Sequence, residues 1–200
     1  KPWHNIPIIE NNEKLIPIPK VLRFLKPHPY VNSGAPYKNI FNPWNLREGV
    51  VSRLLKVNDY LKNQKTQYSL ILYDTWRPLE VQAYMFDLAF LTLSRKRGLN
   101  ISLNEKRLYP EILKEVEQFW AYPSKDKKNP PPHSTGGAID LTMIDNCGNL
   151  VDMGCDIDDM DDTAKPDFYL KSKTGLKFLW NQRRSILRNA MTRFGFAQHP

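Results

Sequence analysis

Proline is concentrated at the start of the chain. Eight of the sixteen prolines fall within the first 45 residues. A proline inside a helix removes a backbone hydrogen bond and clashes with the preceding turn, so this region is not expected to form a long helix. We therefore predict that residues 1–45 form an extended, proline-rich segment that packs on a domain of residues 46–200. Together the two parts are expected to make a single domain.

Four segments after residue 45 predict helices. Apolar residues recur with helical spacing in residues 46–64, 75–97, 104–120 and 174–196. Pro78 and Glu80 favour a helix start, while Pro110 leaves open whether the third helix is interrupted. Gly195 favours a helix stop.

Two short apolar runs predict strands. These runs, "YSLILYD" and "GGAIDLTMI", cover residues 68–74 and 136–144. The segment "DNCGN" after the second run is typical of a turn, and "LVDMG" is a candidate returning strand. Helices mixed with a few strands and a hairpin favour the α+β class, with a small antiparallel sheet flanked by helices.

The charge pattern and the cysteines limit the classes of function. The chain has 29 basic and 21 acidic residues, but the basic residues are scattered in ones and twos apart from "RKR" and "KDKK". This distribution is typical of a solvated surface and does not favour nucleic-acid binding. No apolar run reaches the length of a membrane span. Cys147 and Cys155 match no metal or redox spacing. They could pair across a hairpin, but we expect two free, buried thiols.

The pair His133 and Asp140 is the strongest candidate for chemistry. Six residues stand between them, and a Gly-Gly turn within that stretch could bring both side chains to one point. Imidazole nitrogen and carboxylate oxygen are standard zinc ligands, and a catalytic zinc ion needs three protein ligands and an open position. The alternative is a structural pair joined by a hydrogen bond.

Two further segments contain candidate residues. Arg77 follows a predicted strand and precedes a predicted helix, where an arginine could stabilise negative charge that develops on a substrate. The alternative is that Arg77 pairs with Asp74 or another local carboxylate. The segment "DMGCDIDDMDD" lacks the glycine and the ligand spacing of a calcium loop, and a solvated acidic loop is the simplest interpretation. His4 and His28 lie in the proline-rich region, and we expect both on the surface.

Taken in chain order, "YDTWRP", "HSTGGAIDLT", "DMGCDIDDM" and "NQRRSILRNAMTRFGF" resemble the D-alanyl-D-alanine dipeptidase family of zinc peptidases. The family includes the vancomycin-resistance dipeptidase and is related to D,D-carboxypeptidases and the hedgehog-type fold. The resemblance covers roughly residues 30–198. It implies a hedgehog/D,D-peptidase-like domain, one catalytic zinc ion, Zn2+, and a small D,D-dipeptide from bacterial cell-wall chemistry as substrate. No nucleic-acid or membrane partner is implied.

The resemblance also implies roles for individual residues. His133 and Asp140 would bind zinc, and Arg77 would stabilise the tetrahedral intermediate. Asp158 would bind the free ammonium group of the dipeptide. Ser134, beside the metal-binding histidine, is assigned to substrate binding or to support of the site. Tyr30 and Tyr37 lie in a region that covers the cleft in the family, and we assign them no role.

This chain departs from the family pattern at two places. Pro130, Pro131 and Pro132 stand where the family has a small polar residue before the metal-binding histidine. The family also has an E-W-W-H segment with the catalytic glutamate and the third zinc-binding histidine, which we expect after Pro200; His199 falls too early to be that histidine. A fragment of a longer protein and a protein without its base are both open interpretations.

Three alternative functions remain at this stage. A D,D-carboxypeptidase acting on longer peptidoglycan stem peptides would use the same zinc ligands in an open cleft. A non-catalytic form would bind peptide or metal without turnover. A basic nucleic-acid-binding protein would show a steep salt dependence of binding. The sequence leaves both the bacterial cytoplasm and the periplasm open as the compartment, and it indicates no oligomeric state.

Overall fold

The computed structural model describes residues 8–37 and 42–198. The chain divides into two compact units. The first unit comprises residues 1–17, 26–47 and 74–139, and the second comprises residues 18–25, 48–73 and 140–200. The division at residue 45 that we expected from the prolines stays a prediction. His4 and His199 lie outside the described residues.

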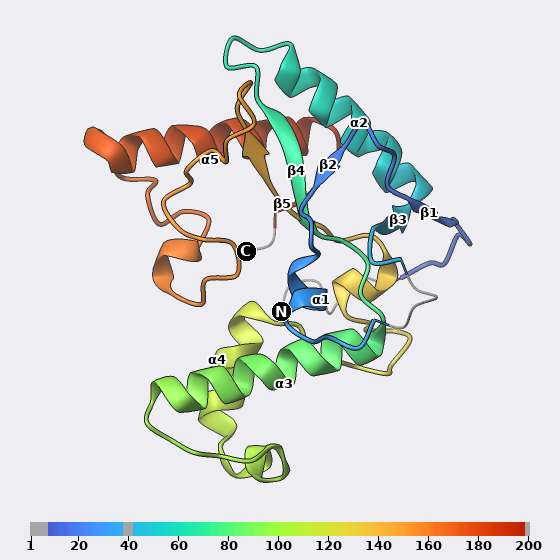
Figure 1. The fold of residues 1–200 in the computed structure, drawn as a ribbon, viewed down its shortest axis with the longest axis vertical. Coiled ribbons are helices and arrows are strands. Elements are labelled where there is room, and N and C mark those ends of the chain that lie inside the picture. The colour runs from blue at the N-terminus through green and yellow to red at the C-terminus, as the bar shows by residue number, and fades with distance from the viewer. Residues whose placement is uncertain (1–7, 38–41, 199–200) are drawn as a thin grey trace. The chain divides into compact units, whose positions relative to one another are not determined.

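Two helices pack against each other in the first unit. Helix α3 (Leu79–Lys96) packs against helix α4 (Pro110–Phe119), and the 3-10 helix η2 (Leu103–Leu108) lies between them in the chain (Figure 1). Both helices bury apolar residues, among them Val81, Phe86, Phe90, Ile112 and Val116. Pro110 occupies the first turn of α4, where a missing backbone N–H is tolerated. The expected helix over residues 104–120 is therefore two separate helices.

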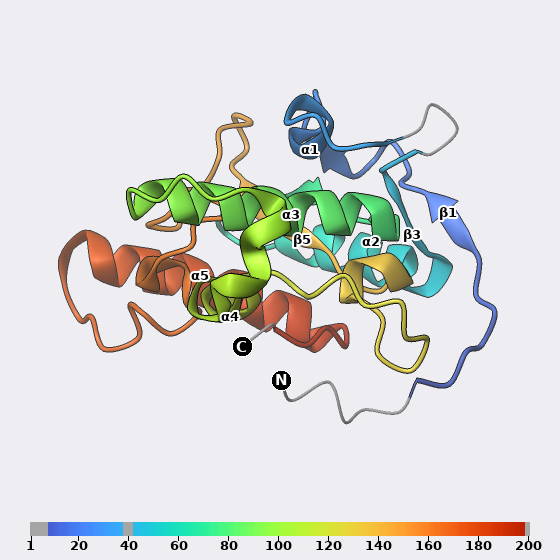
Figure 2. The ribbon, with the colours of Figure 1, turned by 90° about the horizontal axis from the view of Figure 1, so that it is seen from below.

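The described residues of the proline-rich start of the chain contain little regular secondary structure. The one helix among its described residues is α1 (Pro29–Asn32), which has four residues. Strand β1 (Leu15–Pro17) pairs with strand β3 (Asn45–Arg47) in antiparallel register, with Leu15 opposite Arg47 (Figure 2). The 3-10 helix η3 (Pro132–Thr135) completes the first unit. The prolines exclude a long helix because each one removes a donor and fixes the backbone.

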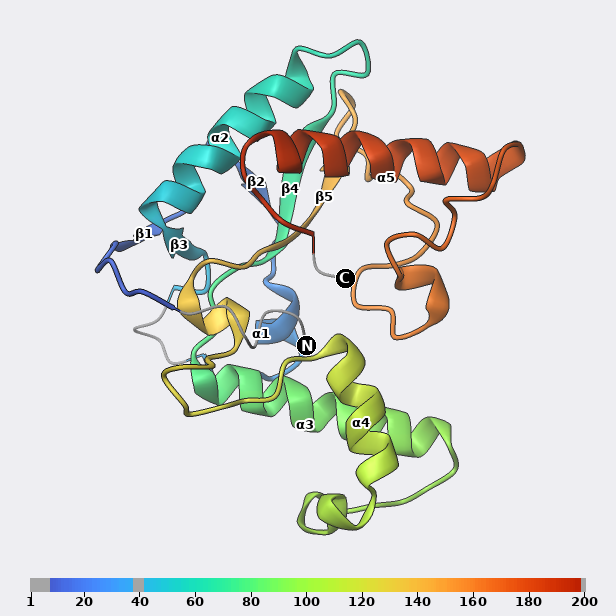
Figure 3. The ribbon, with the colours of Figure 1, turned by 180° about the vertical axis from the view of Figure 1, so that it is seen from behind.

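A small sheet and two long helices form the second unit. Strands β2 (Arg23–Phe24), β4 (Ser69–Asp74) and β5 (Asp140–Ile144) form a three-stranded sheet in the order β2-β4-β5. Helices α2 (Glu48–Lys62) and α5 (Gly175–Arg193) contact each other (Figure 3), and the short 3-10 helix η4 (Asp162–Ala164) precedes α5. The α+β class is confirmed. None of the helices in the described part of the chain has the length and hydropathy that crossing a bilayer requires.

One feature of the sheet differs from the prediction. Strands β2 and β4 are parallel, with Arg23 opposite Ile71 and Phe24 opposite Leu72, whereas we expected an antiparallel sheet. Parallel neighbours need a long crossover connection, and about forty residues separate these two strands. We expected an antiparallel sheet because of the hairpin after β5. No sequence pattern indicated β2, which is only two residues long.

The predicted turn after β5 is confirmed, but the returning strand is not. The side chain of Asp145 accepts hydrogen bonds from the backbone N–H groups of Cys147 and Asn149, at 2.9 and 2.8 Å. Beyond the turn, a single bridge joins Ile144 and Leu150. Both cysteines are free, as expected, but Cys147 is exposed at this turn and Cys155 is half-buried. The prediction of two buried thiols was therefore wrong, because the polar turn places Cys147 in solvent.

Candidate active site

The centre of the candidate site is the carboxylate of Asp74. Asp74 is the last residue of β4 and is fully buried. The strand alternates buried and half-buried residues, and this alternation directs the side chains of Leu70, Leu72 and Asp74 to the buried face. An ionised carboxylate in such a place is stable only if charged or hydrogen-bonding partners compensate for the lost water.

Three side chains supply that compensation. Arg77 donates from Nε to Asp74 Oδ2 at 2.6 Å. His133 Nδ1 lies 3.0 Å from the same oxygen, and His28 Nε2 lies 3.3 Å from Asp74 Oδ1. Burial by itself would raise the pKa of Asp74, but the charge of Arg77 and the hydrogen bonds of both histidines outweigh it and hold the pKa well below the ordinary range. Asp74 is therefore ionised.

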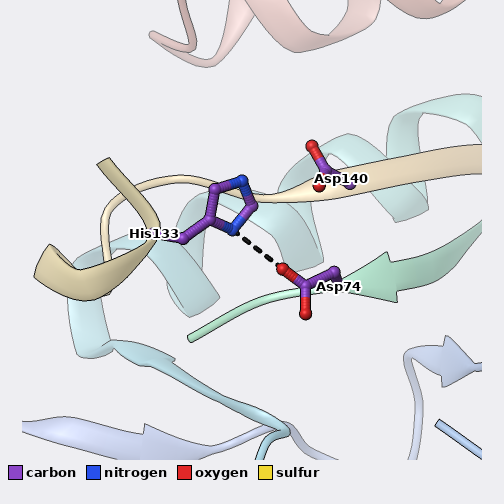
Figure 4. A group of neighbouring side chains, drawn as sticks. All are labelled: Asp74, His133 and Asp140. Carbon is purple, nitrogen blue, oxygen red and sulfur yellow. Dashed lines mark ion pairs between the residues drawn. The ribbon is translucent and has the colours of Figure 1, made fainter. Parts of the chain in front are cut away.

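The local structure around His133 fixes which ring nitrogen carries the hydrogen. His133 lies in η3, and its Nδ1 is 2.7 Å from the backbone oxygen of Thr75 as well as 3.0 Å from Asp74 (Figure 4). A carbonyl oxygen and an ionised carboxylate can only accept, so Nδ1 must donate. In a neutral imidazole the lone pair is then on Nε2. A carboxylate that accepts from the other ring nitrogen produces the same arrangement in metal-binding histidines.

The turn that carries His133 is tied to β3. The backbone N–H of Arg47 donates to the oxygen of Gly136 at 3.0 Å, and Arg47 Nε donates to the oxygen of Thr135 at 2.9 Å. Gly136 has a φ of +74°, and a Cβ added there would lie 2.3 Å from Leu15 Cδ2. The left-handed conformation favours glycine, and a side chain there would also have to displace the tip of Leu15. The first of the two glycines in the motif is therefore needed to end η3 beside the β1–β3 pair.

Arg77 is buried, and several side chains fix its guanidinium. Besides the bond to Asp74, Nη1 donates to Gln82 Oε1 at 3.1 Å and Nη2 donates to the hydroxyl of Tyr30 at 3.2 Å. The guanidinium also lies over the rings of Tyr30 and Trp120, at 4.9 and 5.0 Å from the ring centroids. The pairing of Arg77 with Asp74 that we named as the alternative is confirmed. This pairing is compatible with a role in catalysis, because a fixed guanidinium is pre-oriented for a substrate.

Sequence reasoning missed Gln82, Tyr30 and Trp120 as parts of this cluster. Gln82 is 1% exposed and donates from Nε2 to the backbone oxygen of Ala121 at 2.7 Å, so both ends of its amide are used. Its place on the buried face of an amphipathic helix was a weak signal, since a polar residue on such a face requires a partner. The only signal for Tyr30 was its place in a region that covers the cleft in the family, which gave it no role, and Trp120 gave no signal in the sequence beyond being aromatic.

The prediction that His28 lies on the surface was wrong. His28 is 5% exposed and forms the N-cap of α1, where its Nδ1 accepts from the backbone N–H of Tyr30 at 3.2 Å. Its ring packs at 4.5 Å from that of Trp44. The neighbouring prolines suggested an exposed loop, but the carboxylate of Asp74 offers a buried partner for the imidazole. Tyr37 lies nearby, and burial followed by the charge of Asp74 raises its pKa.

The other predicted residues occupy defined positions. Ser134 follows His133 in η3; its backbone oxygen accepts from Trp76 Nε1 at 3.3 Å, and its hydroxyl is buried without a hydrogen-bond partner among the described residues. Asp140 is the first residue of β5, in the second unit. Asp158 is exposed in a loop of the second unit and has a φ of +69°. The roles assigned to these residues stay predictions.

The chain is similar to known peptidases over its whole length. The family model Peptidase M15, described as D-ala-D-ala dipeptidase, matches residues 39–200. The curated protein "D-alanyl-D-alanine dipeptidase" from Synechocystis sp. (strain ATCC 27184 / PCC 6803 / Kazusa) is 34% identical over 207 residues. That alignment covers 100% of this chain and 83% of the relative. The match to the family model includes the buried cluster at Asp74, Arg77 and His133.

Proposed function

Because the chain belongs to the M15 peptidase family of D-ala-D-ala dipeptidases, we propose that it hydrolyses the free dipeptide D-Ala-D-Ala to two D-alanines. The family is metal-dependent, and zinc is the metal that we propose. The observation that carries the proposal is the buried carboxylate of Asp74, which orients one candidate metal ligand, His133, and one candidate catalytic group, Arg77.

We propose His133 and Asp140 as metal ligands. Two contacts of Nδ1 in His133 leave the lone pair of the neutral ring on Nε2, so the imidazole has the tautomer that binding through Nε2 requires. The carboxylate of Asp140 supplies the oxygen donor that zinc accepts beside imidazole nitrogen. A bound zinc ion would polarise the peptide carbonyl and lower the pKa of a bound water to about 7.

Arg77 is the proposed stabiliser of negative charge on the reacting carbonyl oxygen. Its guanidinium is permanently charged, and its contacts with Asp74, Gln82 and Tyr30 fix the plane of its donors. Donors that are oriented before the reaction need no reorganisation when the charge develops, which is the main reason that such groups accelerate hydrolysis. Burial strengthens the effect because little water screens the charge.

Asp158 is the proposed binding group for the substrate ammonium, and Ser134 is proposed to contact or support the bound peptide. A free dipeptide differs from a longer stem peptide in having a charged amino end. A carboxylate at that position therefore favours the dipeptide and distinguishes this function from a D,D-carboxypeptidase. The exposure of Asp158 supports the proposal, since the side chain can reach a ligand from solvent.

The test is an assay of released alanine, of the D or L form as the substrate requires, with three substrates, namely D-Ala-D-Ala, N-acetyl-D-Ala-D-Ala and L-Ala-L-Ala. It uses the full-length protein, including any residues after Pro200 that carry the glutamate and histidine expected from the family. We expect hydrolysis of D-Ala-D-Ala alone, loss of activity after dialysis against a chelator, and recovery with Zn2+. Equal or faster hydrolysis of the acetylated substrate would instead support a D,D-carboxypeptidase. Activity that survives complete removal of metal would contradict the metal dependence.

Two variants separate metal binding from substrate binding. His133→Ala should reduce both bound zinc and turnover, because it removes a proposed ligand. Asp158→Ala should slow hydrolysis of D-Ala-D-Ala at low substrate concentration, through a higher KM, while the zinc content stays at one ion per chain. An equal loss of zinc and turnover in Asp158→Ala would contradict the role that we assign to Asp158.

A further inference from the structure

The guanidinium of Arg184 contacts several points of the acidic loop in the second unit. Arg184 lies on α5 and donates to three backbone oxygens: Nε to Met153 at 2.8 Å, Nη2 to Thr163 at 2.8 Å and Nη1 to Lys165 at 3.0 Å. Its Nη2 also lies 3.1 Å from Cys155 Sγ. One side chain thus joins two stretches of the chain, residues 153–155 and residues 163–165, that flank Asp158. We call residues 153–165 the acidic loop.

An aromatic residue supports the same arrangement. The ring of Tyr169 lies 4.6 Å from the guanidinium of Arg184, and its hydroxyl donates to the backbone oxygen of Gly154 at 2.7 Å. The guanidinium is therefore bound on its edges by carbonyl oxygens and on its face by an aromatic ring. A planar fork with five donors can satisfy this geometry, and a lysine ammonium cannot.

The acidic loop needs such an external contact. It contains five aspartates, at positions 156, 158, 159, 161 and 162, and like charges in a short segment repel one another. Asp158 also has a φ of +69°, a left-handed conformation that costs a side chain about 1 kcal/mol or more. A strained conformation persists only where the surrounding contacts determine it. Closing both ends of the loop on one guanidinium restricts the conformations open to Asp158.

We propose that Arg184 is a positioning residue for substrate specificity, which fixes the acidic loop and thereby places Asp158 against the ammonium group of the dipeptide. The inference rests on the proposed function for the role of Asp158. Arg184 itself does not need to touch the substrate. Because the ammonium takes no part in the chemistry, the contact contributes to binding in the ground state and the transition state alike, and its loss should appear in KM.

The test compares Arg184→Lys with Arg188→Lys. Arg188 lies one turn further along α5 and donates to the oxygen of Pro166 and to Asp167, at 3.0 and 2.9 Å, just outside the acidic loop. We expect Arg184→Lys to raise KM for D-Ala-D-Ala about tenfold with kcat nearly unchanged, and Arg188→Lys to leave both constants close to those of the wild type. An unchanged KM in Arg184→Lys, or equal effects of the two variants, would overturn the inference.

A double variant tests whether Arg184 acts through Asp158. If it does, Arg184→Lys combined with Asp158→Ala should bind D-Ala-D-Ala no more weakly than Asp158→Ala alone. Effects that multiply would show that Arg184 acts elsewhere and would overturn the inference. Should Arg184→Lys not fold, Tyr169→Phe removes a single contact to the same loop, and it should raise KM in the same direction by a smaller factor.

Hydrogen exchange separates this inference from the proposed function. Backbone amides of residues 155–162 should exchange faster in Arg184→Lys than in the wild type, and not in Arg188→Lys. A wild-type protein that does not hydrolyse D-Ala-D-Ala would contradict the proposed function, whereas unchanged exchange in Arg184→Lys would contradict the fixing of the loop. A wild type that is active, with faster exchange but unchanged KM in the variant, would contradict only the link to specificity.

Discussion

Arg77 and Asp74 form a buried ion pair in which Nε donates to Oδ2 over 2.6 Å. The two residues are three positions apart in the chain, at the junction between β4 and α3. Each compensates for the burial of the other, since an isolated charge in this place would be strongly unfavourable. Asp74 also orients both residues of the proposed chemistry, because it contacts His133 as well as Arg77.

Arg77→Lys is expected to reduce catalysis more than substrate binding. A lysine keeps a positive charge near Asp74 but loses the planar donors that reach Gln82 and Tyr30. We expect kcat for D-Ala-D-Ala to fall about 10²- to 10³-fold with a small change in KM. Steady-state kinetics measure both constants. Arg97→Lys, at an exposed position, is the matched control and should leave kcat unchanged; a normal kcat in Arg77→Lys would contradict the assigned role.

Asp74→Asn is expected to destabilise the protein strongly. The substitution removes the charge that compensates Arg77, and it replaces one of the two carboxylate oxygens, which face Arg77, His133 and His28, by an NH2 group that cannot accept. Breaking a buried pair from one side typically costs about 3–5 kcal/mol. Denaturant unfolding measures the loss. Asp162→Asn is the control, because the pair of Asp162 with Lys165 is largely exposed and should contribute less than about 1 kcal/mol. Similar losses in the two variants would show that burial of the Asp74 pair has no special importance.

Gly154→Ala tests the packing of the acidic loop. Gly154 has a φ of +84°, and an added Cβ would lie 2.6 Å from Trp180 Cδ2 and 2.8 Å from Tyr169 Cε2. We expect a loss of about 2–4 kcal/mol in the free energy of unfolding, from backbone strain together with the clash. Gly98→Ala is the control for backbone strain without a clash, since Gly98 has a φ of +74° and an added Cβ would have nothing within 4 Å. A loss in Gly154→Ala no greater than in Gly98→Ala would rule out the clash.

We predict that ionised Asp152 stabilises the folded protein, and that this contribution depends on pH. Trp180 Nε1 donates to its Oδ2 at 2.7 Å, and this bond, with a second from the backbone N–H of Gly154, lowers the pKa of Asp152 below its ordinary value of 3.8. A lowered pKa in the folded state means that the contribution is fully present at pH values above the ordinary pKa. It is lost as the pH falls through the lowered one.

The corresponding measurement is the Tm of the wild type and of Asp152→Asn across that pH range. The variant should have the lower Tm at about pH 7, and the difference should shrink as the pH falls below the ordinary pKa of 3.8. Trp180→Phe removes the first donor and should reduce the pH dependence in the same way. A difference between wild type and Asp152→Asn that is constant with pH would show that the ionised carboxylate does not stabilise the fold.

Much of the secondary structure could be predicted because its causes are local. The apolar spacing in residues 46–64 and 174–196 matches α2 and α5, and the apolar run at 68–74 matches β4. Pro110 and Gly136 have conformational preferences that act within one or two residues, and both occupy the helix boundaries where those preferences apply. His133, Asp140 and Arg77 could also be identified from the sequence, because their residue types and spacing match motifs of the family that the chain resembles.

Local patterns in the sequence predict most of the helices, the main strand and the residues to suspect, but the contacts among those residues depend on the tertiary fold. His28 is buried because it lies beside Asp74, which is 46 positions away in the chain. Arg77 is fixed by Tyr30, 47 positions before it, and β2 pairs with β4 across a similar separation. Such contacts depend on how the whole chain closes on itself, and a local pattern carries no information about the partner that a buried polar group will find.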